Sequence, residues 1–110
     1  MLAQIRNMPE RKDPARNQYD YAHYQAHAAI CAAIKKATGR TLILRPIWPV
    51  TDMRIFLQSH QAMHDDMNRS QGFPGTDLTK LDDEDEIARK DWGWRNYQQH
   101  QQIQNKLRIP

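Results

Sequence analysis

The chain has 110 residues, 39% of them hydrophobic, and a formal net charge of +3 at pH 7. This length allows one small domain. No apolar run approaches the roughly 18 residues that a membrane span needs, so we expect no membrane partner and synthesis in the cytoplasm. The single cysteine, Cys31, excludes an intramolecular disulfide and fits a reducing compartment.

Residues 1–13 show no helical or strand period, and we expect an extended basic arm. Such an arm can contact nucleic acid or an acidic protein surface, although four cations are few for a dedicated phosphate-binding stripe. The cations assigned to partner contact are Arg6, Arg11, Lys12 and Arg16.

A first helix is predicted over residues 14–38. Asp13 followed by Pro14 is a helix-start signal, because the aspartate caps the first turn and a proline in that turn loses no hydrogen bond. Gly39 is predicted to end this helix, since glycine readily adopts the left-handed conformation that follows many helices.

Residues 40–50 form an apolar segment that Pro46 and Pro49 interrupt, which excludes a helix. We predict a proline-rich connector between the first and second helices. Two interpretations stay open: the segment covers the open side of the bundle, or it docks another chain. The residues assigned to partner contact here are Leu42, Leu44, Ile47 and Trp48.

A second helix is predicted over residues 52–71, capped by Thr51 and ended by Gly72, because apolar positions recur at three- and four-residue spacing. A third helix is predicted over residues 84–107. It begins near Asp83 within an acidic run, with Glu86 in capping-box position. The glutamines near its end favour packing against a partner. The predicted fold is all-α: a small three-helix bundle in residues 14–110.

The five histidines follow one spacing that repeats along the chain. Two residues four apart recur in each predicted helix, and successive pairs start 37 and 36 residues apart. Residues four apart share a helix face, so the three helices are expected to turn these side chains toward a common interior. The members of this candidate polar layer are His23, His27, His60, His64, Asn96 and His100.

Three interpretations of this layer compete. The one that we favour from the sequence is a buried polar layer, in which imidazoles hydrogen-bond to one another, to tyrosines or to trapped water. The second is a metal site, because His-x-x-x-His on a helix is a good chelating pair for Zn²⁺; against it, six positions exceed a tetrahedral shell. In the third, some histidines face a partner or a subunit interface. No cofactor is therefore assigned from the sequence.

Catalysis has little support in the sequence. The His-Glu-x-x-His motif of zinc hydrolases and the glycine-rich phosphate loop are both missing from it. Cys31 lies four residues after His27, but a buried free cysteine more commonly fills a small core position. We therefore predict no enzyme activity and no catalytic residue.

Three strings carry a resemblance to a known group: YAHYQAHAAICAAIKKATG, FLQSHQAMHDDMN and GTDLTKLDDEDEIARKDWGWRNYQQH. With them the chain resembles short proteins encoded among the virion genes of tailed bacteriophages. The basic start and the proline-rich connector depart from that group. The resemblance implies a non-enzymatic structural or assembly component of the virion, in the capsid, head–tail connector or tail. Its implied partners are other virion proteins and further copies of the chain.

Two other functions stay open. A small nucleic-acid-binding regulator would use the basic arm, although the predicted helices are acidic or rich in glutamine where a DNA-reading helix is cationic. A histidine-rich metal-binding protein would use the candidate polar layer.

Overall fold

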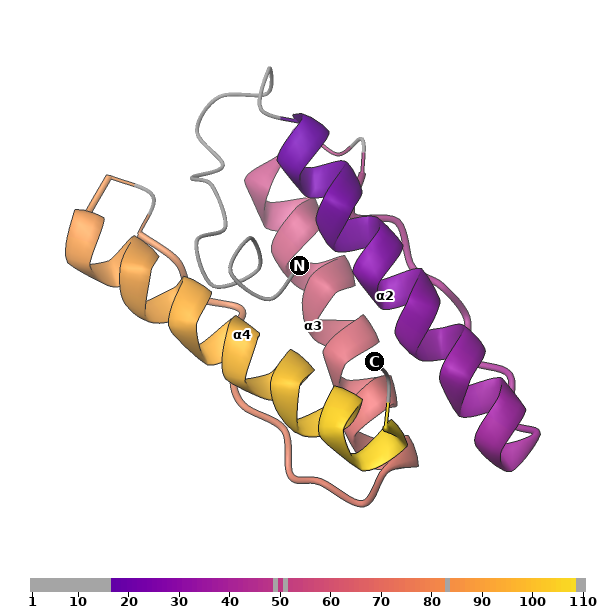
Figure 1. Ribbon diagram of the computed structural model, residues 1–110. Helices are drawn as coiled ribbons and strands as arrows, with labels where there is room; N and C mark the ends of the chain where they lie inside the picture. Colours follow the sequence, from indigo (N-terminus) through magenta and orange to yellow (C-terminus); the bar gives the residue numbers. More distant parts are fainter. Residues whose placement is uncertain (1–16, 49, 51, 83, 109–110) are drawn as a thin grey trace.

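The computed structural model describes residues 17–48, 50, 52–82 and 84–108 (Figure 1). This part of the chain forms three helices, α2 (Asn17–Thr38), α3 (Met53–Ser70) and α4 (Glu86–Leu107), and no strand. The predicted all-α three-helix fold is confirmed. The predicted arm, the helix start at residues 13–14 and the four basic partner residues Arg6, Arg11, Lys12 and Arg16 lie outside the described residues.

The ends of α2 and α3 follow the glycine signals of the sequence. Gly39 has a φ of 77° and donates its N–H to the Lys35 carbonyl at 2.8 Å. Gly72 has a φ of 76°, and the N–H of Phe73 reaches back to the Asn68 carbonyl at 2.9 Å, which forms a Schellman motif. Both helices end where glycine permits the left-handed turn.

The starts of α3 and α4 differ from the predicted caps. Asp52 caps α3, because its Oδ1 accepts from the backbone N–H groups of Arg54 and Ile55. Asp85 caps α4 in the same way, so the predicted start near Asp83 with Glu86 in a capping box is wrong. In each case an aspartate adjacent to the first turn satisfies its exposed donors.

All three helices run in the same direction (Figure 1). Two apolar clusters lie on opposite sides of the histidines. Cluster A contains Ile30, Ile34, Met63, Met67 and Ile103. Cluster B contains Ile47, Phe56, Leu57, Leu78 and Trp92. Along both α3 and α4 the chain passes cluster B first, then the histidines, then cluster A.

The connectors must therefore run back along the bundle. Leu42 and Leu44 pack against cluster A, whereas Ile47 and Val50 pack in or against cluster B. An extended residue advances about 3.3 Å along the chain and a helical residue about 1.5 Å. A connector can therefore return along a helix that contains more residues than the connector does. The repeat of 36 to 37 residues is thus one helix together with its returning connector.

This course corrects one predicted partner contact. Ile47 is fully buried in cluster B, so it belongs to the core and is not available to another chain. Leu42 and Leu44 are partly buried and also pack inward. Trp48 is half-buried, with its ring centroid 4.6 Å from that of Tyr21. These contacts are accounted for if the first connector covers the open side of the bundle, which is one of the two interpretations left open by the sequence.

The second connector is held by hydrogen bonds to the helices that flank it. Gln61 of α3 donates to the Thr76 carbonyl at 3.1 Å and accepts from the Leu78 N–H at 2.6 Å. Trp92 of α4 donates its indole N–H to the Leu78 carbonyl at 2.9 Å. These bonds place the buried Leu78 side chain in cluster B, at the same end as the buried part of the first connector.

Candidate metal centre

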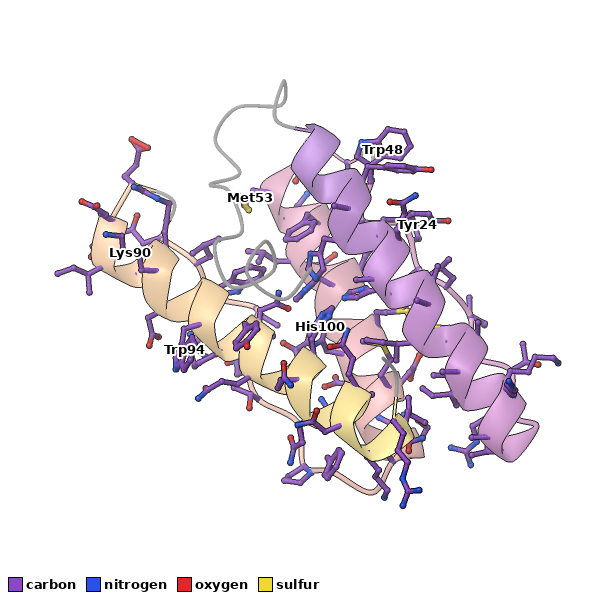
Figure 2. All side chains as sticks on the ribbon, viewed as in Figure 1. Tyr24, Trp48, Met53, Lys90, Trp94 and His100 are labelled. Atoms are coloured by element: carbon purple, nitrogen blue, oxygen red, sulfur yellow. The ribbon has the colours of Figure 1, made fainter. Side chains whose placement is uncertain are left out.

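All six positions of the candidate polar layer are buried between cluster A and cluster B, each at most 1% exposed. The predicted burial of this layer is confirmed. Figure 2 shows His100 at the centre of the molecule, among the three helices. The six side chains form two levels. The first level contains the first member of each pair, His23, His60 and Asn96. The second level lies one helical turn further along and contains His27, His64 and His100.

The second level is a triangle of imidazole nitrogens with one vertex from each helix. The Nε2 atoms are 3.2 Å apart between His27 and His64, 3.0 Å between His27 and His100, and 3.1 Å between His64 and His100. The Nε2 atom of His23, in the first level, lies 3.2 Å from that of His100. The ligand atoms of these four histidines all lie within 4.8 Å of one another.

Hydrogen bonding alone does not account for this convergence. An imidazole nitrogen carries either one N–H or one lone pair, so each Nε2 atom can form one hydrogen bond. Four nitrogens can therefore form two such bonds, but four Nε2–Nε2 contacts lie between 3.0 and 3.2 Å. At least two contacts thus join nitrogens with no proton between them, which is unfavourable in a buried site.

One cation between the four nitrogens removes this conflict. Zn²⁺ bonds of about 2.0–2.1 Å to imidazole in a tetrahedron place the nitrogens roughly 3.3–3.4 Å apart. The four short contacts are within a few tenths of an ångström of that spacing. The objection that six positions exceed a tetrahedral shell does not hold, because four of the six converge.

Gln99 fixes the tautomer of His64. The Gln99 Oε1 atom has only lone pairs to offer, so His64 Nδ1, at 2.8 Å, carries the proton and donates it. The same oxygen accepts from Asn68 Nδ2 at 2.9 Å, and both amide residues are buried. With its proton on Nδ1, His64 presents a lone pair at Nε2. Metal-ligating histidines are commonly oriented by such an outer hydrogen bond.

Gln99 and Asn68 are functional residues that the sequence analysis missed. Gln99 lies within the run of glutamines that was expected to favour packing against a partner, but it is buried beside His64. Asn68 follows His64 by four residues on the same helix face, and this spacing is the signal that would have indicated it. Gln99 lies three residues after Asn96 and four before Ile103, so the same kind of spacing would have placed it on the inner face of its helix.

Four of the five buried histidines are held in the neutral form that binds metal. Burial is the main cause: it lowers the pKa of His27, His60 and His100 well below 6.5, and neighbouring imidazoles lower each pKa further. Burial also lowers the pKa of His64 to about 4, although the bond to Gln99 and the charge of Asp65 act in the opposite direction. Their nitrogens therefore offer lone pairs or N–H groups at neutral pH.

His60 occupies a different environment from the four converging histidines. Its ring packs between Phe56 and Trp92, with centroid distances of 5.2 and 5.0 Å. It is also close to His64, at a centroid distance of 4.1 Å, and to His23, at 4.9 Å. His60 thus lies beside the four-nitrogen group and outside it.

The donor set indicates the chemistry of the centre. Four neutral imidazoles suit a transition-metal dication such as Zn²⁺, whereas Ca²⁺ and Mg²⁺ prefer oxygen ligands. Four protein ligands fill a tetrahedral shell and leave no position for substrate, as in structural sites. Cys31 packs against cluster A, and burial, followed by the charge of Asp66, raises the pKa of its thiol. That thiol is poorly suited to act as a nucleophile.

No family model, curated protein or solved structure matches this chain. Within the described residues, none of the helices has the length and apolar character needed to cross a membrane. The geometry of the centre therefore carries the functional argument.

Proposed function

We propose that this chain is a non-enzymatic metal-binding protein, in which one Zn²⁺ ion joins the three helices through His23, His27, His64 and His100. One observation carries the proposal: the ligand atoms of the four histidines lie within 4.8 Å of one another, four of the six Nε2–Nε2 separations are 3.0–3.2 Å, and hydrogen bonds can account for at most two of these four short contacts. Each helix supplies at least one ligand, so the ion acts as a cross-link in the core.

The metal-free state explains why such a cross-link would matter. In it the four short contacts between buried nitrogens have at most two protons to share, which costs free energy in a small core. An ion that binds the folded chain and not the unfolded one stabilises the fold by mass action. We infer that the bundle gains much of its stability from the ion.

The test uses the purified chain, after removal of metal with a chelator and dialysis. We expect about one equivalent of Zn²⁺ by elemental analysis and a higher unfolding midpoint after Zn²⁺ is restored, since structural zinc sites couple binding to folding. Tetrahedral Co²⁺ in the same site should give an intense visible absorption. His100→Asn should abolish these effects, whereas the exposed Gln102→Asn on the same helix should leave them intact. The polar-layer interpretation would be supported instead if the chain holds no ion and its unfolding midpoint changes with neither Zn²⁺ nor chelator.

We propose in addition that the chain serves as a structural or assembly component of a tailed-phage virion. The resemblance in sequence carries this second proposal, and exposed apolar side chains support a role in protein contacts. Ile87, Ile43 and Trp94 are 80%, 71% and 43% exposed. Single exposed apolar residues are common, so the resemblance carries more weight than these three.

Mass spectrometry of density-purified particles tests the second proposal. Peptides at a fixed copy number relative to the major capsid protein would support it. If the chain is plentiful in infected cells and missing from particles, the virion role is excluded. A salt-dependent shift of DNA in a gel would then favour the nucleic-acid-binding regulator.

A further inference from the structure

The protein holds more buried imidazoles than a tetrahedral ion can use. All five histidines are at most 1% exposed, and four of them converge. The fifth, His60, lies at the first level beside His23, with ring centroids 4.9 Å apart. Because the repeat relates His23 to His60, the two side chains reach the centre from equivalent positions on neighbouring helices.

The two levels have different roles around the ion. The second level supplies three nitrogens, one from each repeat, and these define a triangle. A tetrahedron on that triangle has one further vertex, on the side of the first level. That level offers three equivalent positions, occupied by His23, His60 and Asn96, for this single vertex. We assign this vertex to His23, whose Nε2 atom is 3.2 Å from that of His100 and whose ligand atom lies within 4.8 Å of those of His27 and His64.

We propose that His60 is a reserve ligand, which takes the fourth coordination position when His23 leaves it. This inference rests on the proposed metal centre. His60 is near enough to respond, since its ring centroid lies 4.1 Å from that of His64 and 5.4 Å from that of His27. The stacking of its ring on Phe56 and Trp92 holds it beside the vacated vertex.

The positions of the two histidines along their helices indicate when the exchange would occur. His23 lies in the first half of α2, on the cluster B side of the centre, and helix ends open more readily than helix middles. His60 lies in the middle of α3, whose start is capped by Asp52. Opening of the first turns of α2 would therefore release His23 while His60 stays in place. The ion would remain four-coordinate, and the centre would retain its metal while the first turns of α2 are open.

The test uses asparagine, because Asn96 already occupies the equivalent position in the third repeat. His23→Asn, His60→Asn and the double variant are loaded with Zn²⁺ or Co²⁺ and compared with the unaltered chain. The number of imidazoles around the ion is measured by X-ray absorption, and the affinity by competition with a chelator. His64→Asn serves as the control at the second level, for which no reserve position exists.

We expect His23→Asn to keep four imidazoles and an affinity within about tenfold of the unaltered chain. The double variant should keep three and lose more than about 100-fold, because even an outer-sphere change costs 10- to 100-fold. His60→Asn alone should keep four imidazoles and release metal to a chelator faster. This last measurement needs no change to a ligand, so it tests the inference even if His23→Asn does not fold.

Two results would overturn the inference: three imidazoles in His23→Asn with an affinity equal to that of the double variant, or an unchanged release rate in His60→Asn. Either could occur while the unaltered chain binds one ion through four imidazoles, in which case the proposed function stands. Failure of the unaltered chain to bind any ion would remove both proposals together.

Discussion

At the scale of single residues, the centre depends on which ring nitrogen of each histidine carries the proton. The contact between His64 Nδ1 and Gln99 Oε1 settles this for one ligand. It also ties the imidazole of His64 on α3 to an amide of α4. In the proposed centre, the uncharged Gln99 side chain thus controls whether a lone pair of His64 faces the ion.

Gln99→Ala should therefore lower the affinity for Zn²⁺ by about 10- to 100-fold, the usual effect of losing an outer-sphere hydrogen bond. Gln99→Glu should keep the affinity or raise it, because a carboxylate accepts the same proton and offsets the charge of the ion. Competition against a chromophoric chelator measures both. The exposed Gln98→Ala is the matched control, and equal affinities for Gln98→Ala and Gln99→Ala would show that this hydrogen bond is unimportant.

The lowered pKa values of the histidines predict that acid destabilises the metal-free protein. The unfolded chain takes up protons on its histidines near pH 6.5, whereas the folded chain resists this until about pH 4 at His64 and well below 6.5 at His27, His60 and His100. The unfolded state therefore binds more protons as pH falls through 6.5. The free energy of unfolding therefore falls by about 1.4 kcal/mol per pH unit for each histidine that the folded chain keeps neutral.

Chemical unfolding of the chelator-treated protein between pH 8 and pH 5 measures this loss. The free energy of unfolding should be steady above about pH 7 and fall steeply below pH 6.5. A midpoint that stays flat over this range would mean that the imidazoles are not held neutral in the core.

At the scale of secondary-structure elements, the sequence predicted the helices and their inner faces well. The four-residue spacing of the histidines fixes a helix face, and so their burial followed from the sequence alone. The glycines at 39 and 72 marked the helix ends because each has a positive φ. The direction of the helices did not follow, because a periodic pattern reads the same for parallel and antiparallel neighbours.

The first connector shows another limit of prediction from sequence. An apolar segment indicates that something covers it, but the pattern does not say whether the cover is this chain or another. Ile47 was expected to meet a partner and lies in cluster B. Ile43, four residues earlier in the same segment, is 71% exposed. Only the path of the backbone distinguishes the two isoleucines.

Ile47→Ala should lower the free energy of unfolding by about 2–5 kcal/mol, because it leaves a cavity in the core. Ile43→Ala removes the same atoms from an exposed site of the same connector. It should change the free energy of unfolding by less than about 0.5 kcal/mol. Urea titration of the two variants, both loaded with Zn²⁺, gives the comparison. Similar losses in both would contradict the inward packing of Ile47.

At the scale of the whole molecule, three helices and the two connectors between them surround a polar centre with an apolar cluster on each side. This arrangement places the proposed ligands where the three helices meet, so that in the proposed function the fold and the ion depend on each other. The sequence indicated the repeat but not the convergence of four nitrogens, which requires the relative rotation of three helices and the rotamer of each imidazole.

The metal-loaded chain should therefore unfold in one cooperative transition, whose midpoint rises with the concentration of free Zn²⁺. At 100 times the dissociation constant the added stability is about 2.7 kcal/mol. Calorimetry at several buffered concentrations of Zn²⁺ measures this dependence. His64→Asn should unfold at a midpoint that no longer responds to Zn²⁺.

The order in which the ligands occur along the chain has a consequence for biosynthesis. His23 and His27 leave the ribosome first, His64 follows, and His100 emerges only with α4. A nascent chain that ends before α4 offers at most three of the four proposed ligands, and its parallel helices lack their third neighbour. In the proposed function, capture of the ion through all four ligands would therefore follow translation of all three helices.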